Sequence, residues 1–125
     1  MKIIYVTTKE EYGLAIETIK LWKEFGIDTE TNQLNPFMAD VLLLQIGNEK
    51  IQYVFDVYEV NMFCPTWTGI REILESDQYL KIGHNLEFDY KMIKHVLGIT
   101  LENIFDTMIA EMLLTKGKKL QGFAL

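Results

Sequence analysis

The sequence predicts an α/β protein in which a mixed β-sheet is flanked by helices. Short apolar runs of strand length alternate with longer segments whose apolar residues recur every three to four positions, the spacing of a helix that covers a sheet. Two of the short runs are separated by a turn at Gly47 and Asn48, which favours an antiparallel hairpin within the sheet. The remaining strand and helix units favour parallel neighbours joined by right-handed crossovers.

The individual elements follow from local signals. Thr8 and Glu11 have the spacing of a capping box, so a helix is expected to begin there. Thr66, Asn85 and Asp106 are residue types that favour the first position of a helix, and each precedes an apolar pattern of helical period. The strands are expected at residues 3–6, 25–29, 41–46, 51–56, 79–83 and 104–105.

A single domain over residues 1–125 accounts for the length, and 49% hydrophobic residues supply its core. The longest uninterrupted apolar runs are four residues long, whereas a membrane helix needs about 20. The start of the chain becomes acidic after a short apolar run, so no signal peptide is expected. The single cysteine excludes an internal disulfide and fits a reducing compartment. We therefore expect a soluble cytoplasmic protein.

The net charge of −6 argues against binding a polyanion by bulk electrostatic attraction alone. The acidic excess lies in residues 1–78, with thirteen Asp and Glu against six Lys and Arg. The remaining residues carry six basic and five acidic side chains, and a solvated surface explains that balance without any ligand. Charge alone therefore leaves the class of partner open.

The first chemical signal is the segment Asp28-Thr29-Glu30-Thr31, at the carboxyl end of a predicted strand. Side chains alternate along an extended strand, so Asp28 and Glu30 are expected to point to the same side. Two like charges so placed favour a divalent cation or a proton between them. Alternatively, both acids solvate the end of a strand before a loop, and this motif alone does not decide between the two.

Two further acids also follow the carboxyl ends of predicted strands. Asp89 lies in the first turn of the helix that follows the strand at 79–83, and Asp106 follows the strand at 104–105. As an alternative to chemistry, Asn85 and Asp89 serve as cap and dipole partner of one helix, and Asp106 caps the next. Together, however, the three strand ends place acids along one carboxyl edge of the sheet, where α/β proteins build their sites.

The chain resembles the 3′-5′ exonuclease domains of the DEDD superfamily in three segments, GIDTETNQL, KIGHNLEFDYKMI and NIFDTMIAEMLL. The similarity is greatest to the proofreading domains of family A DNA polymerases from bacteria and phages, and it runs from about Phe25 to Leu114. The resemblance implies a ribonuclease H-like fold. Its mixed five-stranded sheet would have an antiparallel three-strand part and parallel strands, flanked by helices and lacking the C-terminal helices.

The resemblance implies that Asp28, Glu30 and Asp89 are catalytic residues that hold two Mg²⁺ or Mn²⁺ ions. Asp28 would bridge the ions, Glu30 would hold the ion beside the attacking water, and Asp89 would support the second ion. Two such ions stabilise the attacking and the leaving oxygens of a displacement at phosphorus. Their charge would also let a protein of net charge −6 accept a phosphodiester.

The resemblance further implies contacts with the 3′ end of a single-stranded nucleic acid, DNA in preference to RNA. Thr31 and Leu34 would contact the terminal nucleotide, with Leu34 as a wedge between the last two bases. Asn85 would bind the sugar-phosphate, and Phe88 would stack on the base. Leu34 and Phe88 are alternatively ordinary core residues. Asp106 is expected to be structural.

The sequence departs from the family pattern after Asp106. Family members carry a fourth carboxylate on a later helix, with a Tyr or His four residues before it that orients or deprotonates the attacking water. No Asp or Tyr follows Asp106, Glu111 is the only later acid, and residues 119–125 look like the start of the next helix. We therefore expect three of the four carboxylates and no general base in this sequence.

Two functions stay open from the sequence. The first is a metal-dependent 3′-5′ exonuclease that releases nucleoside 5′-monophosphates once a companion polymerase chain supplies the missing helix. The second is a catalytically incomplete nucleic-acid-binding or polymerase-associated module. A free-standing RNA-trimming relative is a third interpretation. A neighbouring reading frame that begins with a Tyr-x-x-x-Asp helix would distinguish the first two.

Overall fold

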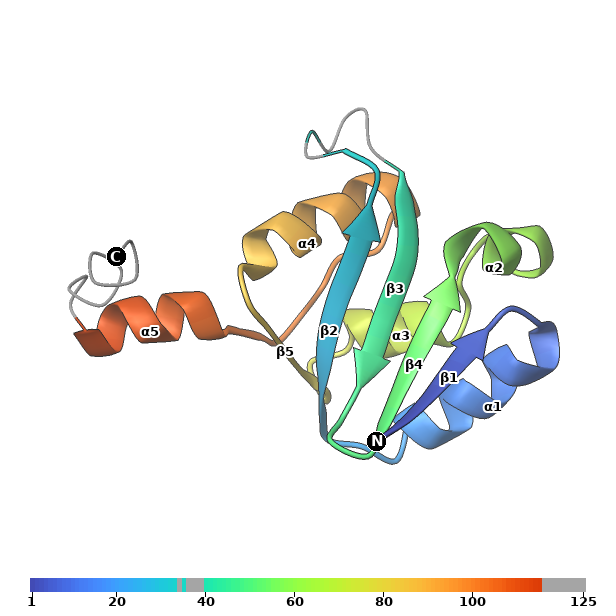
Figure 1. The fold of residues 1–125 in the computed structure, drawn as a ribbon, viewed down its shortest axis with the longest axis horizontal. Coiled ribbons are helices and arrows are strands. Elements are labelled where there is room, and N and C mark those ends of the chain that lie inside the picture. The colour runs from blue at the N-terminus through green and yellow to red at the C-terminus, as the bar shows by residue number, and fades with distance from the viewer. Residues whose placement is uncertain (34, 36–39, 116–125) are drawn as a thin grey trace.

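The computed structural model describes residues 1–33, 35 and 40–115 as one sheet with its helices (Figure 1). The six strands are β1 (Lys2–Val6), β2 (Glu24–Thr31), β3 (Val41–Gly47), β4 (Ile51–Asp56), β5 (Leu80–Gly83) and β6 (Ile104–Asp106). The helical elements are α1 (Lys9–Ile19), α2 (Val57–Phe63), α3 (Ile70–Glu75), α4 (Leu86–Met92), the π-helical turn η1 (Ile93–Leu97) and α5 (Thr107–Thr115). Within these residues, no helix has the length and apolar character that crossing a membrane requires.

The sheet has the strand order β1-β4-β3-β2-β5-β6. Strands β2, β3 and β4 pair antiparallel, whereas β1 pairs parallel with β4, and β5 and β6 continue the sheet parallel to β2. The predicted α/β class, with a mixed sheet and an antiparallel three-strand part, is therefore confirmed. The sheet has six strands rather than the five that the resemblance implies, and β1 and β6 are its two edge strands.

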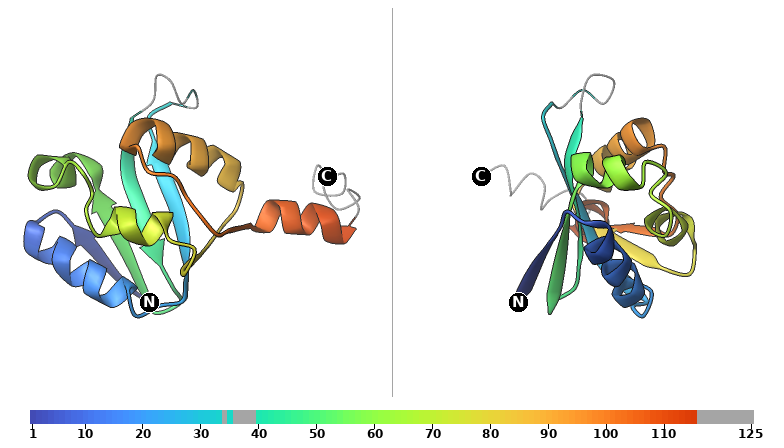
Figure 2. Two further views of the ribbon diagram at one scale, coloured as in Figure 1. Left: turned by 180° about the vertical axis from the view of Figure 1, so that it is seen from behind. Right: turned by 90° about the vertical axis from the view of Figure 1, so that its right-hand side faces the viewer.

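Helices α1 to α4 all lie on one face of the sheet, as both views in Figure 2 show. Alternate residues of β2 point to this covered face, where Phe25, Ile27 and Thr29 are buried. Phe25 and Ile27 join a core cluster with helix residues that include Ala15, Ile16, Ile19, Leu86 and Met92. The core therefore lies between the sheet and these four helices.

The opposite face, which we call the open face, carries the intervening residues of the strands. Asp28 and Glu30 are exposed on β2. The register across β3 and β4 places Tyr5 of β1 on the same face as Asp28, and Ile3 beside it. Ile3 is 55% exposed and Tyr5 is 64% exposed. At the other edge of the sheet, α5 projects away from the rest of the molecule (Figure 1).

Caps explain where α1 and α2 begin. The predicted capping box is present, because the backbone N–H of Glu11 donates to Thr8 Oγ1 at 3.2 Å and the N–H of Thr8 donates to Glu11 Oε1 at 3.1 Å. Helix α2 was not expected from the sequence. It begins because Asp56, the last residue of β4, accepts a hydrogen bond from the N–H of Glu59 at 3.1 Å.

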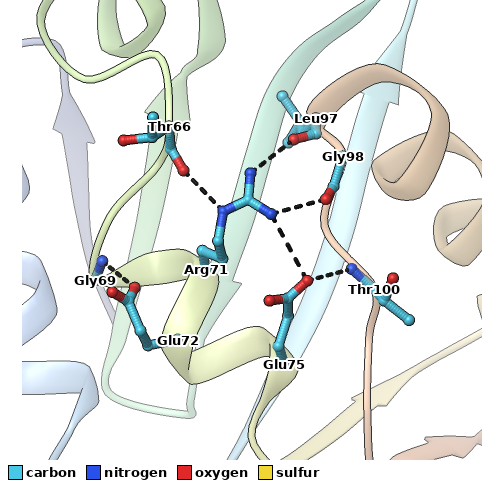
Figure 3. A network of polar contacts seen from close by, with 8 residues as sticks. All are labelled: Thr66, Gly69, Arg71, Glu72, Glu75, Leu97, Gly98 and Thr100. Carbon is cyan, nitrogen blue, oxygen red and sulfur yellow. Dashed lines mark hydrogen bonds and ion pairs between the residues drawn. The ribbon is translucent and has the colours of Figure 1, made fainter.

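Helix α3 begins later than predicted. A helix capped by Thr66 is wrong, because Trp67 has a φ of 56°, which no right-handed helix allows. Gly69 occupies the cap position with a φ of 94°, and its N–H donates to the Glu72 carboxylate (Figure 3). Positive φ at this position favours glycine, so the helix starts where the chain first returns to right-handed geometry.

Arg71 joins α3 to the segment that follows η1 (Figure 3). Its guanidinium donates to the carbonyl oxygens of Gly98 at 2.8 Å, Leu97 at 3.2 Å and Thr66 at 3.0 Å. Glu75, an ion-pair partner of Arg71 at 3.7 Å, accepts from the N–H of Thr100 at 2.9 Å. These contacts fix the connection between η1 and β6, and with it the position of the edge strand.

Candidate functional site

Asp28 and Glu30 lie at the carboxyl end of β2, a central strand with β3 on one side and β5 on the other. Both side chains are exposed on the open face, as the alternation of an extended strand predicts. Asp28 Oδ1 accepts a hydrogen bond from the N–H of Thr29 at 2.9 Å. The strand pairing is irregular between Glu30 and Thr31, directly after the second acid. The two carboxylates therefore share one accessible strand end.

Asp89 approaches the same strand end from the covered face. It lies in α4, is 3% exposed, and accepts a hydrogen bond from Thr29 Oγ1 at 2.5 Å. Burial raises the pKa of Asp89, the bond from Thr29 opposes that shift, and the charge of Asp28 adds to it. Asp89 and Asp28 thus lie on either side of Thr29, one accepting from its side chain and the other from its backbone N–H.

The three acids do not converge on one point. Among the residues that the structure describes, no three His, Cys, Asp or Glu side chains are arranged to hold a metal ion together. Asp28 and Glu30 are on the open face, whereas Asp89 is turned toward Thr29. The donor chemistry nevertheless fits a hard divalent cation, since two exposed carboxylates on one side of a strand offer the oxygen ligands that Mg²⁺ and Mn²⁺ prefer.

Asn85 does not cap α4 with its side chain, contrary to the prediction. It is exposed, adopts left-handed backbone angles with φ 58° and ψ 50°, and makes no capping hydrogen bond through its side chain. Asp106 takes this role from β6: its carboxylate accepts from the N–H of Asn85 at 2.9 Å and of Leu86 at 2.8 Å. Asp106 also accepts from the N–H of Met108 at 2.9 Å, in the first turn of α5.

The expected substrate-binding residues differ in what the structure shows of them. Phe88 is partly buried and packs against the core cluster. Thr31 follows the two acids directly, and its hydroxyl donates to the carbonyl of Gln33 at 3.0 Å. Leu34 lies outside the described residues, as do residues 119–125. Thr31 thus lies directly after the acids, and Asn85 and Phe88 lie at the start of α4, the helix that carries Asp89.

Two threonines to which the sequence analysis gave no role support the site. Thr29 holds Asp89, and Thr107 Oγ1 donates to the carbonyl of Gly83 at 3.2 Å. Thr107 Oγ1 also lies 3.0 Å from Nδ1 of His84. The signal for Thr29 was present in the sequence, because a residue between two exposed strand acids faces the core and a buried hydroxyl requires a partner.

A hollow of about 480 Å³ adjoins the carboxyl end of β2, because its lining includes Val41 and Leu43, which pair with Thr31 and Glu30. A hollow of about 350 Å³ beside the start of α4 is lined by His84, Phe105, Thr107, Ala110, Glu111 and Leu114. A hollow of about 590 Å³ is lined by residues that include Glu24, Gly26 and Gly47. The largest of these three is therefore at the amino end of β2, away from the acids.

Comparison with known proteins agrees with this geometry. A family profile described as 3′-5′ exonuclease matches residues 3–124. DNA polymerase I of Aquifex aeolicus (strain VF5) is 35% identical over 114 residues, which cover 91% of this chain and 18% of that protein. The exosome complex component 10 homolog of Caenorhabditis elegans is 25% identical over 108 residues, which cover 84% of this chain and 12% of that protein. The chain thus spans less than a fifth of either relative.

Solved structures share the fold. Escherichia coli RNase D aligns with a TM-score of 0.76 and 19% identity, over 89% of this chain and 28% of that one. Trypanosoma brucei RNase D in complex with RNA aligns with a TM-score of 0.73 and 17% identity, over 85% of this chain and 37% of that one. The profile match over residues 3–124 shows that this chain belongs to the 3′-5′ exonuclease family, and the shared fold agrees with it.

Proposed function

We propose that this chain is a proofreading-type 3′-5′ exonuclease domain that acts on the 3′ end of single-stranded DNA and releases nucleoside 5′-monophosphates with two Mg²⁺ or Mn²⁺ ions. The observation that carries the proposal is the pair of exposed carboxylates, Asp28 and Glu30, at one strand end with Asp89 behind it. A solvated strand end explains the exposed pair, but it does not explain a third, buried carboxylate that is hydrogen-bonded to the threonine between them.

The three carboxylates would have different roles, according to the face of the sheet on which each lies. Bound divalent ions supply positive charge for the attacking water and the leaving oxygen at phosphorus. Asp28 and Glu30 would hold such ions, since both are exposed on the same side of β2. Asp89 would support the second ion from its place beside Thr29. Because its pKa is raised, the Asp89 carboxyl of the metal-free protein stays protonated to a higher pH than an ordinary aspartate does.

Substrate contacts would come from the residues that follow Asp28 and Glu30 and from the start of α4. Phe88 would stack on a base, and Asn85 would bind the sugar-phosphate at the exposed start of α4. Thr31 and Leu34 would contact the terminal nucleotide. The preference for DNA is supported by the 35% identity to a DNA polymerase I, compared with 31% to a piRNA biogenesis protein and 25% to an exosome component. An RNA 3′ end is the alternative that the experiment below distinguishes.

A specific observation favours a second candidate, a catalytically incomplete module. The sequence contains no Asp or Tyr after Asp106. A fourth carboxylate and a general base would then have to come from outside these 125 residues, for example from a companion polymerase chain. Loss of a general base costs roughly 10²- to 10⁴-fold in rate. On this view residues 1–125 form a single, partial domain, and the one cysteine supports a cytoplasmic location.

The test is digestion of 5′-labelled single-stranded DNA and RNA of the same sequence in Mn²⁺. The chain alone should digest slowly or not at all. Addition of a polypeptide that carries a Tyr-x-x-x-Asp helix should produce 3′-5′ digestion of DNA that Asp28→Ala abolishes. Glu24→Ala, on the same strand and face but at its other end, is the matched control and should remain active. Failure of every mixture to bind or digest either oligonucleotide would contradict the proposed function.

A further inference from the structure

Asp106 makes hydrogen bonds to two segments that are far apart in the sequence. Its Oδ1 accepts from the N–H of Met108 and from the N–H of Asn85, each at 2.9 Å. Its Oδ2 accepts from the N–H of Leu86 at 2.8 Å. The bond to Met108 is an ordinary cap of the following helix, α5. The bonds to Asn85 and Leu86 cross from β6 to the start of α4 and are not needed for that cap.

The neighbouring residue, Thr107, holds the same turn from the other side. Its hydroxyl has one proton, which it donates to the carbonyl of Gly83 at 3.2 Å. Thr107 Oγ1 also lies 3.0 Å from Nδ1 of His84. Residues 106 and 107 thus contact the backbone or side chain of every residue from Gly83 to Leu86.

The start of α4 has hydrogen-bond partners outside the helix. Asn85 has left-handed backbone angles, which asparagine adopts more readily than most residues with a side chain. Its side chain makes no capping bond, although the first N–H groups of a helix lack partners within the helix. The Asp106 carboxylate accepts from two of these N–H groups, Asn85 and Leu86. The direction in which α4 leaves the sheet is therefore set from β6.

We propose that Asp106 is a positioning residue of the nuclease site, which holds the turn at residues 84–86 so that Asn85 and Phe88 meet the substrate and Asp89 meets Thr29. This inference rests on the proposed function and adds a role to a residue expected only to be structural. Asp106 contacts neither of the exposed acids. It acts through the start of α4, because Phe88 and Asp89 are in the first turn of that helix.

The experiment compares Asp106→Ala and Asp106→Asn with a matched control, Asp56→Ala. Asp56 also ends a strand and caps the next helix, but it accepts only from the nearby N–H of Glu59. The melting temperature, the amide NMR signals of Phe88 and Asp89, and the affinity for a 5′-labelled single-stranded DNA in Ca²⁺ are measured for each variant. Asp106→Asn keeps an oxygen that can accept the hydrogen bonds from the N–H groups of Asn85 and Met108. It replaces Asp106→Ala in the comparison if the alanine variant does not fold.

Both alanine variants should lower the melting temperature. Only Asp106→Ala should move the Phe88 and Asp89 signals and weaken DNA binding, by roughly tenfold, the usual effect of removing a group that orients a site residue. Asp106→Asn should recover part of that affinity. If Asp106→Ala leaves the signals and the affinity as Asp56→Ala does, Asp106 is only a cap and the inference is wrong. If the wild type does not bind DNA, the proposed function fails, and the NMR signals still decide whether Asp106 positions α4.

Discussion

The two faces of the sheet differ in what lies against them, although the same strands build both. On β2, Phe25, Ile27 and Thr29 point to the covered face and are buried, whereas Asp28 and Glu30 alternate with them on the open face. The covered face is packed by four helices (Figure 2). The open face combines exposed apolar residues at one edge with exposed carboxylates at its centre.

The covered face accounts for the stability of the fold, whereas the open face carries the groups that could bind a ligand. Burial of apolar surface stabilises the fold, and it occurs on the covered face. An exposed apolar surface with charged groups is typical of a site that receives a ligand or another segment. Asp89 is the exception, because it is a carboxylate on the covered face that is hydrogen-bonded to Thr29, the residue between the two exposed acids. The comparison therefore predicts different responses to substitution on the two faces.

The largest effect is expected from matched aromatic truncations. Trp67 is fully buried, donates through Nε1 to Asn61 Oδ1 at 2.7 Å, and makes edge contacts with Tyr12 and Phe55. Trp67→Ala should lower the free energy of unfolding by about 3–5 kcal/mol. Tyr5→Ala, on the open face, should change it by no more than about 0.5 kcal/mol. Urea unfolding measures both, and an equal loss for Tyr5→Ala would mean that the open face is covered in solution.

Two glycines provide the next comparison. A Cβ at Gly83 would lie 2.9 Å from the carbonyl oxygen of Ile27 and would clash with Leu86, so Gly83→Ala should destabilise the protein by about 1–3 kcal/mol. Gly13 lies in α1 with nothing within 4 Å of a Cβ. Gly13→Ala should therefore stabilise by about 0.5–1 kcal/mol. Urea unfolding measures both variants. If Gly83→Ala stabilised the protein as Gly13→Ala is expected to do, the close approach of β5 to β2 would not depend on Gly83.

A smaller, pH-dependent effect is expected from Lys81 on the covered face. It is fully buried and donates to the carbonyls of Ser76 at 2.5 Å and Glu102 at 2.8 Å. Burial lowers the pKa of Lys81 to about 8, against the opposing charges of Glu102 and Asp77. Between that value and the ordinary 10.5, the unfolded chain binds more protons than the folded one. Stability contributed through this group should therefore rise with pH across that window.

Unfolding measured from about pH 7 to pH 10, in wild type and Lys81→Met, isolates this contribution. The difference in stability between the two proteins should change in favour of the wild type as pH rises through the pKa of about 8. Parallel curves for the two proteins would contradict the lowered pKa.

Much of the fold followed from local patterns in the sequence. The capping box at Thr8 and Glu11 and the hairpin turn at Asn48 depend on contacts between near neighbours, and both are present. Helix α2 was missed because its sequence, VYEVNMF, is rich in β-branched and aromatic residues, which favour strands. The Asp56 cap and the packing of Val57 and Val60 into the core stabilise a helix in this segment instead.

The sequence indicated candidate site residues but not how they are arranged in space. Period-two alternation correctly placed Asp28 and Glu30 on one side of β2. It could not show that Thr29, between them, holds a residue 60 positions away. Likewise, Asn85 and Asp106 each had the composition of a local cap, but the pairing of β5 with β6 lets Asp106 act at both helix starts. Contacts of this kind depend on the register of the sheet.

The most direct test of the central claim, that the open-face acids form a metal-dependent site, is a Mn²⁺ titration followed by electron paramagnetic resonance of the free ion. Wild type should bind Mn²⁺, and Asp28→Ala should weaken that binding by roughly tenfold or more, because hard cations need several oxygen ligands. Glu24→Ala, exposed at the opposite end of the same strand, should bind as the wild type does. Equal binding by wild type and Asp28→Ala would contradict the account and leave Asp28 and Glu30 as a solvated strand end.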